Sequence, residues 1–110
     1  MQVLKATEGL SKKAVYDLTR SPRIRKLSEA VGSVLPVMAY VIYLDEKNDG
    51  DAMQILSIQT EDGTVYATNS ATANTEFETI LDIMGQDPFA VEVLKGTSKA
   101  GREYITLALA

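Results

Sequence analysis

Cationic and aromatic side chains gather at short spacing near the C-terminus of this chain. Lys95, Lys99 and Arg102 fall within eight positions, and Tyr104 follows two residues later. Lysine and arginine can pair with the phosphates of a nucleic acid strand, and a tyrosine ring can stack on a base. The segment is therefore a candidate binding site, with a hairpin that its charges keep soluble as the structural alternative.

A second group of cations lies in the N-terminal third. Residues 1–33 carry seven basic and three acidic residues, a balance of +4, whereas residues 34–110 carry four basic and twelve acidic residues, a balance of −8. The net charge of −4 therefore conceals a basic segment that could meet a polyanion, although a solvated helical surface is the simpler alternative. The candidate phosphate contacts in this segment are Arg20, Arg23, Arg25 and Lys26.

Two further tyrosines, Tyr40 and Tyr66, are candidates for stacking on bases because both lie in expected strands. Side chains alternate along a strand, so Tyr40 and Tyr43 should point to opposite faces unless a bulge intervenes. A place in the core is the alternative for Tyr40 and Tyr66. Tyr104 is the strongest surface candidate, because it falls on the polar side of its strand.

The residue types present give little support to catalysis. The absence of cysteine and histidine excludes thiol nucleophiles, disulfides, zinc sites built from these residues and histidine-assisted catalysis. Most acidic residues fall in polar turns, where nothing would desolvate them for acid–base work. Lys47 replaces a ligand in the calcium-like loop 45–51, and Glu103 replaces the hydroxyl of a phosphate-binding loop at 96–102. We therefore expect no enzyme activity, no metal and no cofactor.

The elements that must position these side chains change in kind at about residue 33. Ser11 can cap a first helix, and Ser21 with Pro22 can begin a second helix that ends near Gly32. These helices predict a basic N-terminal helical extension over residues 1–33.

After residue 33 the pattern is that of strands. Runs of β-branched, aromatic and alternating apolar residues predict strands at 37–44, 53–59, 64–68, 88–93 and 104–109. Thr75 and Glu78 fit a capping box at the start of an amphipathic helix after the third strand, and Gly85 ends it. This element order is that of an OB-fold, a five-stranded barrel with a helix between strands three and four. We expect a mostly β (α+β) OB-fold barrel over residues 34–110.

The apolar stretches are short. The longest covers about eight residues at 37–44, far below the roughly 20 that cross a bilayer. The N-terminus does not read as a secretory signal. We expect a cytoplasmic protein with no membrane partner.

Several short motifs resemble those of bacteriophage single-stranded DNA-binding proteins of the OB-fold type. Lys99, Gly101, Arg102 and Tyr104 match a Lys-x-Gly-Arg/Lys-x-Tyr stretch at the junction of strands four and five in such proteins. The segment Tyr66-Ala67-Thr68-Asn69-Ser70 before the helix and the segment Leu18-Thr19-Arg20-Ser21-Pro22 are also similar. The resemblance implies a non-catalytic protein that coats single-stranded DNA in phage replication or recombination, in the host cytoplasm.

The resemblance leaves a homo-oligomer or other replication proteins open as further partners. Asn69 and Ser70 could bond to sugar or bases, although capping of the helix is the simpler role for them. A different class of function is a small phage-encoded interaction module that inhibits a host protein, and the acidic body of the chain favours it. A salt titration of DNA binding distinguishes the two hypotheses.

Overall fold

A computed structural model describes residues 1–46 and 50–110 of the chain. Their fold is mostly β, as the sequence predicts, and the described residues include two α-helices. No helix among these residues is long and apolar enough to span a membrane. The elements in chain order are β1 (Gln2–Ala6), α1 (Lys12–Thr19), β2 (Arg25–Lys26), the 3-10 helix η1 (Leu27–Ala30), β3 (Val34–Pro36), β4 (Ala39–Glu46), β5 (Ala52–Gln59), β6 (Val65–Thr68), α2 (Ala71–Met84), β7 (Ala90–Thr97) and β8 (Glu103–Leu109).

The described strands form two sheets, and no closed barrel is found among them. One sheet has the order β1-β4-β5-β6-β2 and the other has the order β3-β7-β8. The pairings are antiparallel except for β2, which runs parallel to β6. β2 occupies the edge of β6, so β8 does not pair there and the two sheets stay separate on that side.

The two sheets are joined where β3 leads into β4. The amide of Val37 donates to the carbonyl of Phe89, beside β7, at 3.0 Å. The next amide, that of Met38, donates to the carbonyl of Gln59 in β5 at 2.9 Å. The single strand predicted at 37–44 therefore begins later, at Ala39, because its first residues turn from one sheet to the other.

The N-terminal third is less helical than the sequence predicts. The first helix is confirmed as α1, with the hydroxyl of Ser11 accepting a hydrogen bond from the amide of Ala14 at 3.1 Å. The prediction of a second helix is wrong, because Arg25 and Lys26 form a short strand along the edge of β6 and only the 3-10 helix η1 follows them. β1, which the sequence did not predict, pairs with β4. The division of the chain at residue 33 stays a prediction.

α2 begins earlier than the capping box at Thr75 predicts. Its N-cap is Ser70, whose hydroxyl accepts a hydrogen bond from the amide of Ala73 at 3.2 Å. The helix ends at Gly85, as predicted, with φ at 60°. Thr75 is thus an interior residue, and its carbonyl accepts a hydrogen bond from the hydroxyl of Thr79 at 3.1 Å.

The remaining strand predictions hold with shifted ends. The strands predicted at 53–59, 64–68 and 104–109 appear as β5, β6 and β8, each within about one residue of its predicted limits. β7 begins at Ala90 and continues to Thr97, so the predicted loop that joins it to β8 is shorter. The predicted hairpin loop at 45–51 includes residues 47–49, which lie outside the described residues.

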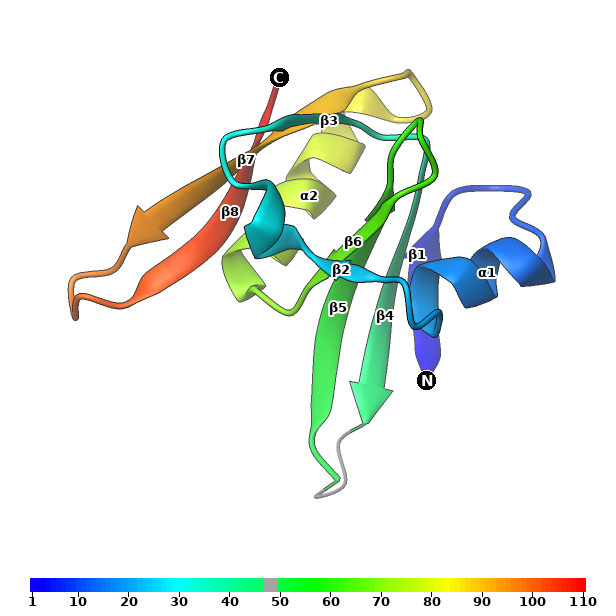
Figure 1. Cartoon of the computed structure of the whole chain (residues 1–110), viewed down its shortest axis with the longest axis horizontal. Coiled ribbons are helices and arrows are strands. Elements are labelled where there is room, and N and C mark those ends of the chain that lie inside the picture. The colour runs from blue at the N-terminus through cyan, green and yellow to red at the C-terminus, as the bar shows by residue number, and fades with distance from the viewer. Residues whose placement is uncertain (47–49) are drawn as a thin grey trace.

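The larger sheet is covered by apolar side chains on both faces. On one face, Phe77 of α2 is fully buried between Tyr40 and Phe89, with ring centroids 5.3 and 5.8 Å away. On the other face, Leu18 of α1 is buried in a second cluster with Val41 and other residues of the sheet. Figure 1 shows α2 between the two sheets and α1 at the N-terminal side of the larger one.

Replacing Phe77 by alanine should destabilise the protein by about 3–5 kcal/mol, because a fully buried aromatic ring is lost and a cavity remains. Ile83→Ala in the same helix is the matched control, since Ile83 is 71% exposed and should change stability by about 0.5 kcal/mol or less. Urea denaturation followed by circular dichroism measures both. Equal effects of the two variants would contradict the role assigned to Phe77.

Candidate nucleic-acid interface

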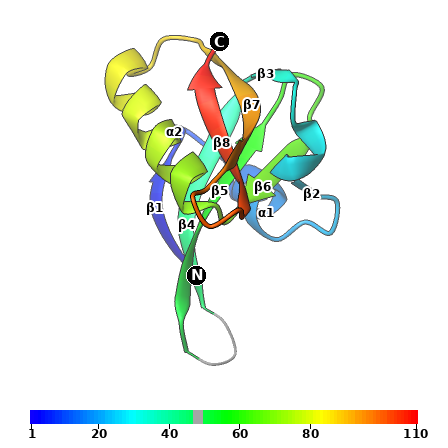
Figure 2. The ribbon, with the colours of Figure 1, turned by 90° about the vertical axis from the view of Figure 1, so that its left-hand side faces the viewer.

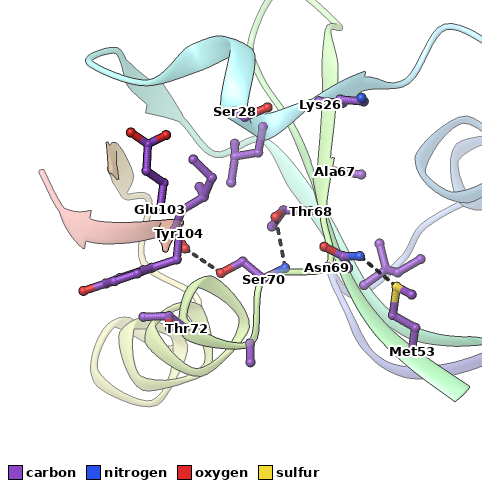
Figure 3. Close-up of a pocket in the computed structure, with 14 residues that line it drawn as sticks. Lys26, Ser28, Met53, Ala67, Thr68, Asn69, Ser70, Thr72, Glu103 and Tyr104 are labelled. Carbon is purple, nitrogen blue, oxygen red and sulfur yellow. Dashed lines mark hydrogen bonds between the residues drawn. The ribbon is translucent and has the colours of Figure 1, made fainter. Parts of the chain in front are cut away.

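A groove of about 810 Å³ opens where β8 and β6 stay apart. Its walls come from four parts of the chain: β2 with η1, β5, the β6–α2 junction and the start of β8. Figure 3 shows these parts facing one another across the groove. The lining residues are Lys26, Leu27, Ser28, Met53, Ile55, Ala67, Thr68, Asn69, Ser70, Ala71, Thr72, Glu103, Tyr104 and Ile105.

Two hairpins extend on either side of this groove. β7 and β8 form one arm, and β4 and β5 form the other, and Figure 1 shows the two arms diverging from the body of the protein. Figure 2 shows β8 in front, with α2 on one side of it and β2 on the other. The groove is therefore an open channel between two arms rather than an enclosed cavity.

Hydrogen bonds of the β6–α2 junction connect the walls of the groove. The hydroxyl of Ser70 donates to the carbonyl of Ile105 in β8 at 2.5 Å, and this bond links the two sides (Figure 3). The side-chain amide of Asn69 donates to the sulfur of Met53 in β5 at 3.0 Å. Ser70 and Asn69 thus have structural roles here, and Ser70 also caps α2 as the simpler sequence hypothesis holds.

Tyr104 lines the groove and is 37% exposed. It lies directly opposite Gly96 in the register of β7 and β8, and its ring covers that glycine. In Figure 3 the ring extends away from Ser70, out along the hairpin. Among the described residues that line the groove, Tyr104 is the one aromatic side chain.

The other two candidate tyrosines lie elsewhere. Tyr40 packs edge-on against Phe77 beneath α2, and burial raises its pKa, with the charge of Glu8 adding to the effect. Tyr66 packs against the same core cluster. Tyr43 belongs to the cluster on the opposite face, as the alternation along the strand predicts.

The C-terminal cations lie along the β7–β8 arm. Lys95 forms an ion pair with Glu103 at 3.0 Å, and both side chains are about half exposed or more, at 48% and 64%. These two residues also line a smaller hollow of about 410 Å³ that shares Ser28 and Tyr104 with the groove. Lys99 and Arg102 lie exposed at the turn of the hairpin, beyond the groove.

The N-terminal cations are divided among several places. Lys26 lines the groove and forms no ion pair within residues 1–46 and 50–110. Arg20 pairs with Asp45 at 2.9 Å, and Arg25 pairs with Glu29 at 3.1 Å. Arg23 lines a separate hollow of about 410 Å³ at another part of the surface. Lys26 and Tyr104 thus line the same groove from opposite sides, and Lys95 lies beside Tyr104 in the smaller hollow (Figure 3). The three arginines lie outside the groove.

Several lining residues were not among the sequence candidates. Met53, Ile55 and Ala67 form an apolar wall from β5 and β6, and Leu27 with Ser28 closes the side next to β2. The alternation of Met53 and Ile55 in the sequence places them on one face of a strand. That this face reaches a groove depends on the pairing of β6 with β2, which the sequence pattern does not show.

The described residues include no group of three or more acidic side chains placed to hold a metal ion. Apolar and aromatic side chains in a channel suit planar rings, and the cations at its rim suit phosphates. The arrangement can therefore hold a flexible polyanion whose bases are unpaired.

Comparison with known protein families agrees with this chemistry. Neither the curated proteins nor the solved structures include one that matches the chain. Residues 4–110, which include every residue of the groove, match the family described as Phage Single-stranded DNA-binding protein. Because the match covers nearly the whole chain, this protein belongs to the phage single-stranded DNA-binding protein family.

Proposed function

We propose that this protein coats single-stranded DNA without catalysis, in phage replication or recombination, and that the groove is where the strand binds. The observation that carries the proposal is that Tyr104, Lys26 and an apolar wall line one open channel between two hairpin arms, with Tyr104 and Lys26 on opposite sides of it (Figure 3). Membership of the phage single-stranded DNA-binding protein family supports strand binding over the alternative of an inhibitor of a host protein. The host cytoplasm is the compartment that this role requires.

The proposed fold is an open form of the OB-fold. The meander of β4, β5 and β6, the helix α2 after it, and the hairpin of β7 and β8 follow the OB-fold order. Pairing of β3 with β7 and of β4 with β5 supports this proposal, because one bent stretch of chain then belongs to both sheets. In OB-folds, oligonucleotides cross the face of strands two and three between the flanking loops. The groove lies between the two arms and over β5 and β6, the strands that correspond to strands two and three in this proposal.

The charges around the groove set how the strand would bind. The body of the protein is acidic, so we expect attraction to phosphate at this site to come from Lys26 in the groove and from Lys99 and Arg102 at the turn of the β7–β8 arm. Such binding depends on the release of counterions and weakens steeply as salt increases. Contacts between bases and the apolar wall do not depend on salt in this way. The two contributions can therefore be separated by a salt titration.

Lys26→Ala should weaken binding to oligo-dT and lower the slope of log affinity against log salt by about 0.7, the value for one phosphate contact on a single strand. Lys12→Ala is the matched control, because it removes the same charge from α1, away from the groove. Fluorescence anisotropy with labelled oligo-dT at several salt concentrations measures both variants. An equal change in slope for the two would show that Lys26 acts only through net charge.

Tyr104→Ala should weaken oligo-dT binding by roughly 5- to 150-fold, because base–aromatic stacking contributes about 1–3 kcal/mol. Tyr104→Phe keeps the ring and should bind nearly as the wild type does. Tyr16→Ala is the control, since Tyr16 is 50% exposed on α1, outside the groove. The same titration measures all three variants. Weaker binding by Tyr104→Phe would mean that the hydroxyl of Tyr104, rather than stacking of its ring, contributes the affinity.

Glu103→Gln should raise affinity for oligo-dT by roughly two- to fourfold at low salt, because it frees Lys95 and removes a negative charge from the groove. Stability should change little, since an exposed ion pair contributes about 0–1 kcal/mol. Glu61→Gln, in the exposed turn between β5 and β6, is the control for a change of net charge. Unchanged affinity in Glu103→Gln would mean that Lys95 takes no part in binding.

A further inference from the structure

Gly96 stands out among the glycines of the chain. Six of the seven glycines have positive φ values, between 60° and 89°, a backbone conformation that other residues rarely adopt. Gly96 does not share this conformation, and it lies inside the strand β7. Glycine within a strand weakens it, so its presence here needs another cause.

The ring of Tyr104 supplies that cause. A Cβ atom built on Gly96 would lie 2.7 Å from Cε2 of Tyr104 and still closer to the hydroxyl end of the ring. Real Cβ atoms essentially never approach so closely, so any other residue at this position would displace the ring. For the other six glycines, a Cβ would meet nothing within 4 Å. The space above Gly96 is thus occupied by the aromatic ring.

This contact determines how the ring is presented. Gly96 and Tyr104 are direct partners across β7 and β8, so the ring folds over the hairpin instead of standing away from it. One side of the ring is then held against the backbone of Gly96, while the residue keeps 37% of its surface exposed beside the groove. A ring that is already held in place loses less conformational entropy when a base stacks on it.

We propose that Gly96 is a positioning residue for strand binding, because its missing side chain seats the ring of Tyr104 as a platform for a base. This inference rests on the proposed function. It differs from a purely structural role, in which the ring only shields a glycine of the sheet. If the role were only structural, loss of the contact between Gly96 and the ring of Tyr104 would change the stability of the protein and leave its affinity for DNA unchanged.

Gly96→Ala tests the proposal, with Tyr104→Ala and the double variant completing a cycle. Gly96→Ala should weaken oligo-dT binding by roughly three- to thirtyfold, part of what a stacked base contributes. The slope against log salt should not change, because no charge is altered. In the Tyr104→Ala background the same substitution should have no further effect, since two alanines fit opposite each other. Equal losses in the two backgrounds would overturn the proposal, because Gly96 would then act independently of the ring.

Thr97→Ala is the control for a general disturbance of the hairpin, since Thr97 is the next residue of β7 and pairs with Glu103. Wild-type affinity in this variant is expected, and a loss equal to that of Gly96→Ala would overturn the proposal. Wild-type affinity in Gly96→Ala would overturn it as well. If the wild-type protein itself fails to bind oligo-dT at low salt, the proposed function falls first and the inference falls with it.

NMR tests the contact between Gly96 and the ring of Tyr104 without DNA, and it also shows whether each variant is folded. The ring of Tyr104 should shift the α-protons of Gly96 upfield in the wild type, and this shift should vanish in Tyr104→Ala. In Gly96→Ala the remaining signals should show a folded protein, while the ring signals of Tyr104 move. The absence of an upfield shift at Gly96 in the wild type would contradict the packing of the ring on Gly96 and overturn the proposal.

Discussion

Two neighbouring amides, those of Val37 and Met38, connect the two sheets, and the arrangement of the groove depends on this connection. One amide pairs with Phe89 beside β7 and the next pairs with Gln59 in β5, so the chain turns from one sheet to the other within a single residue step. The hairpins that continue from these sheets then diverge, as Figure 1 shows, and Phe77 fills the space near the corner. The sheets are thereby held together at one end and remain apart where the groove opens.

The edge of β6 is the second constraint. A barrel would close if β8 paired with this edge, but β2 pairs there instead. The pairing brings Lys26 and η1 to the groove, so the N-terminal third of the chain contributes one wall of it. The sole side-chain hydrogen bond described across the remaining gap runs from Ser70 to the carbonyl of Ile105. The edge of β6 thus pairs with β2 instead of closing a barrel with β8, and the channel stays open between β6 and β8.

The distribution of charge explains how an acidic protein can belong to a family that binds DNA. Five of the cations outside the groove are paired with acidic neighbours, as Arg20 is with Asp45 and Arg25 with Glu29. Exposed pairs of this kind contribute little to stability and leave little net field. The described cations with no such partner are Lys12, Arg23, Lys26, Lys99 and Arg102. The positive charge that these pairs leave uncompensated is therefore carried by a few exposed side chains.

Local signals in the sequence were sufficient for much of the fold. The cap at Ser11, the stop at Gly85 and the alternation along β7 and β8 act over a few neighbouring residues, and the structure confirms each of them. The helix predicted after Pro22 failed because its spacing of apolar residues also suits a short edge strand followed by η1. Pairing with β6 decided between the two, and that partner lies about 40 positions away in the sequence.

The candidate site divides in the same way. The sequence by itself determined which residues could meet phosphates or bases, because that ability belongs to the side chain: Lys26, Lys95 and Tyr104 were all identified by type and spacing. Only the tertiary structure decided that Tyr40 packs beneath α2, that Lys26 reaches the groove, and that Gly96 lies under the ring of Tyr104. The physical reason is that these outcomes depend on which strand edges pair and in what register. Pairing joins residues that are distant in the chain, and local periodicity indicates the face on which a side chain lies but not which strand is its neighbour.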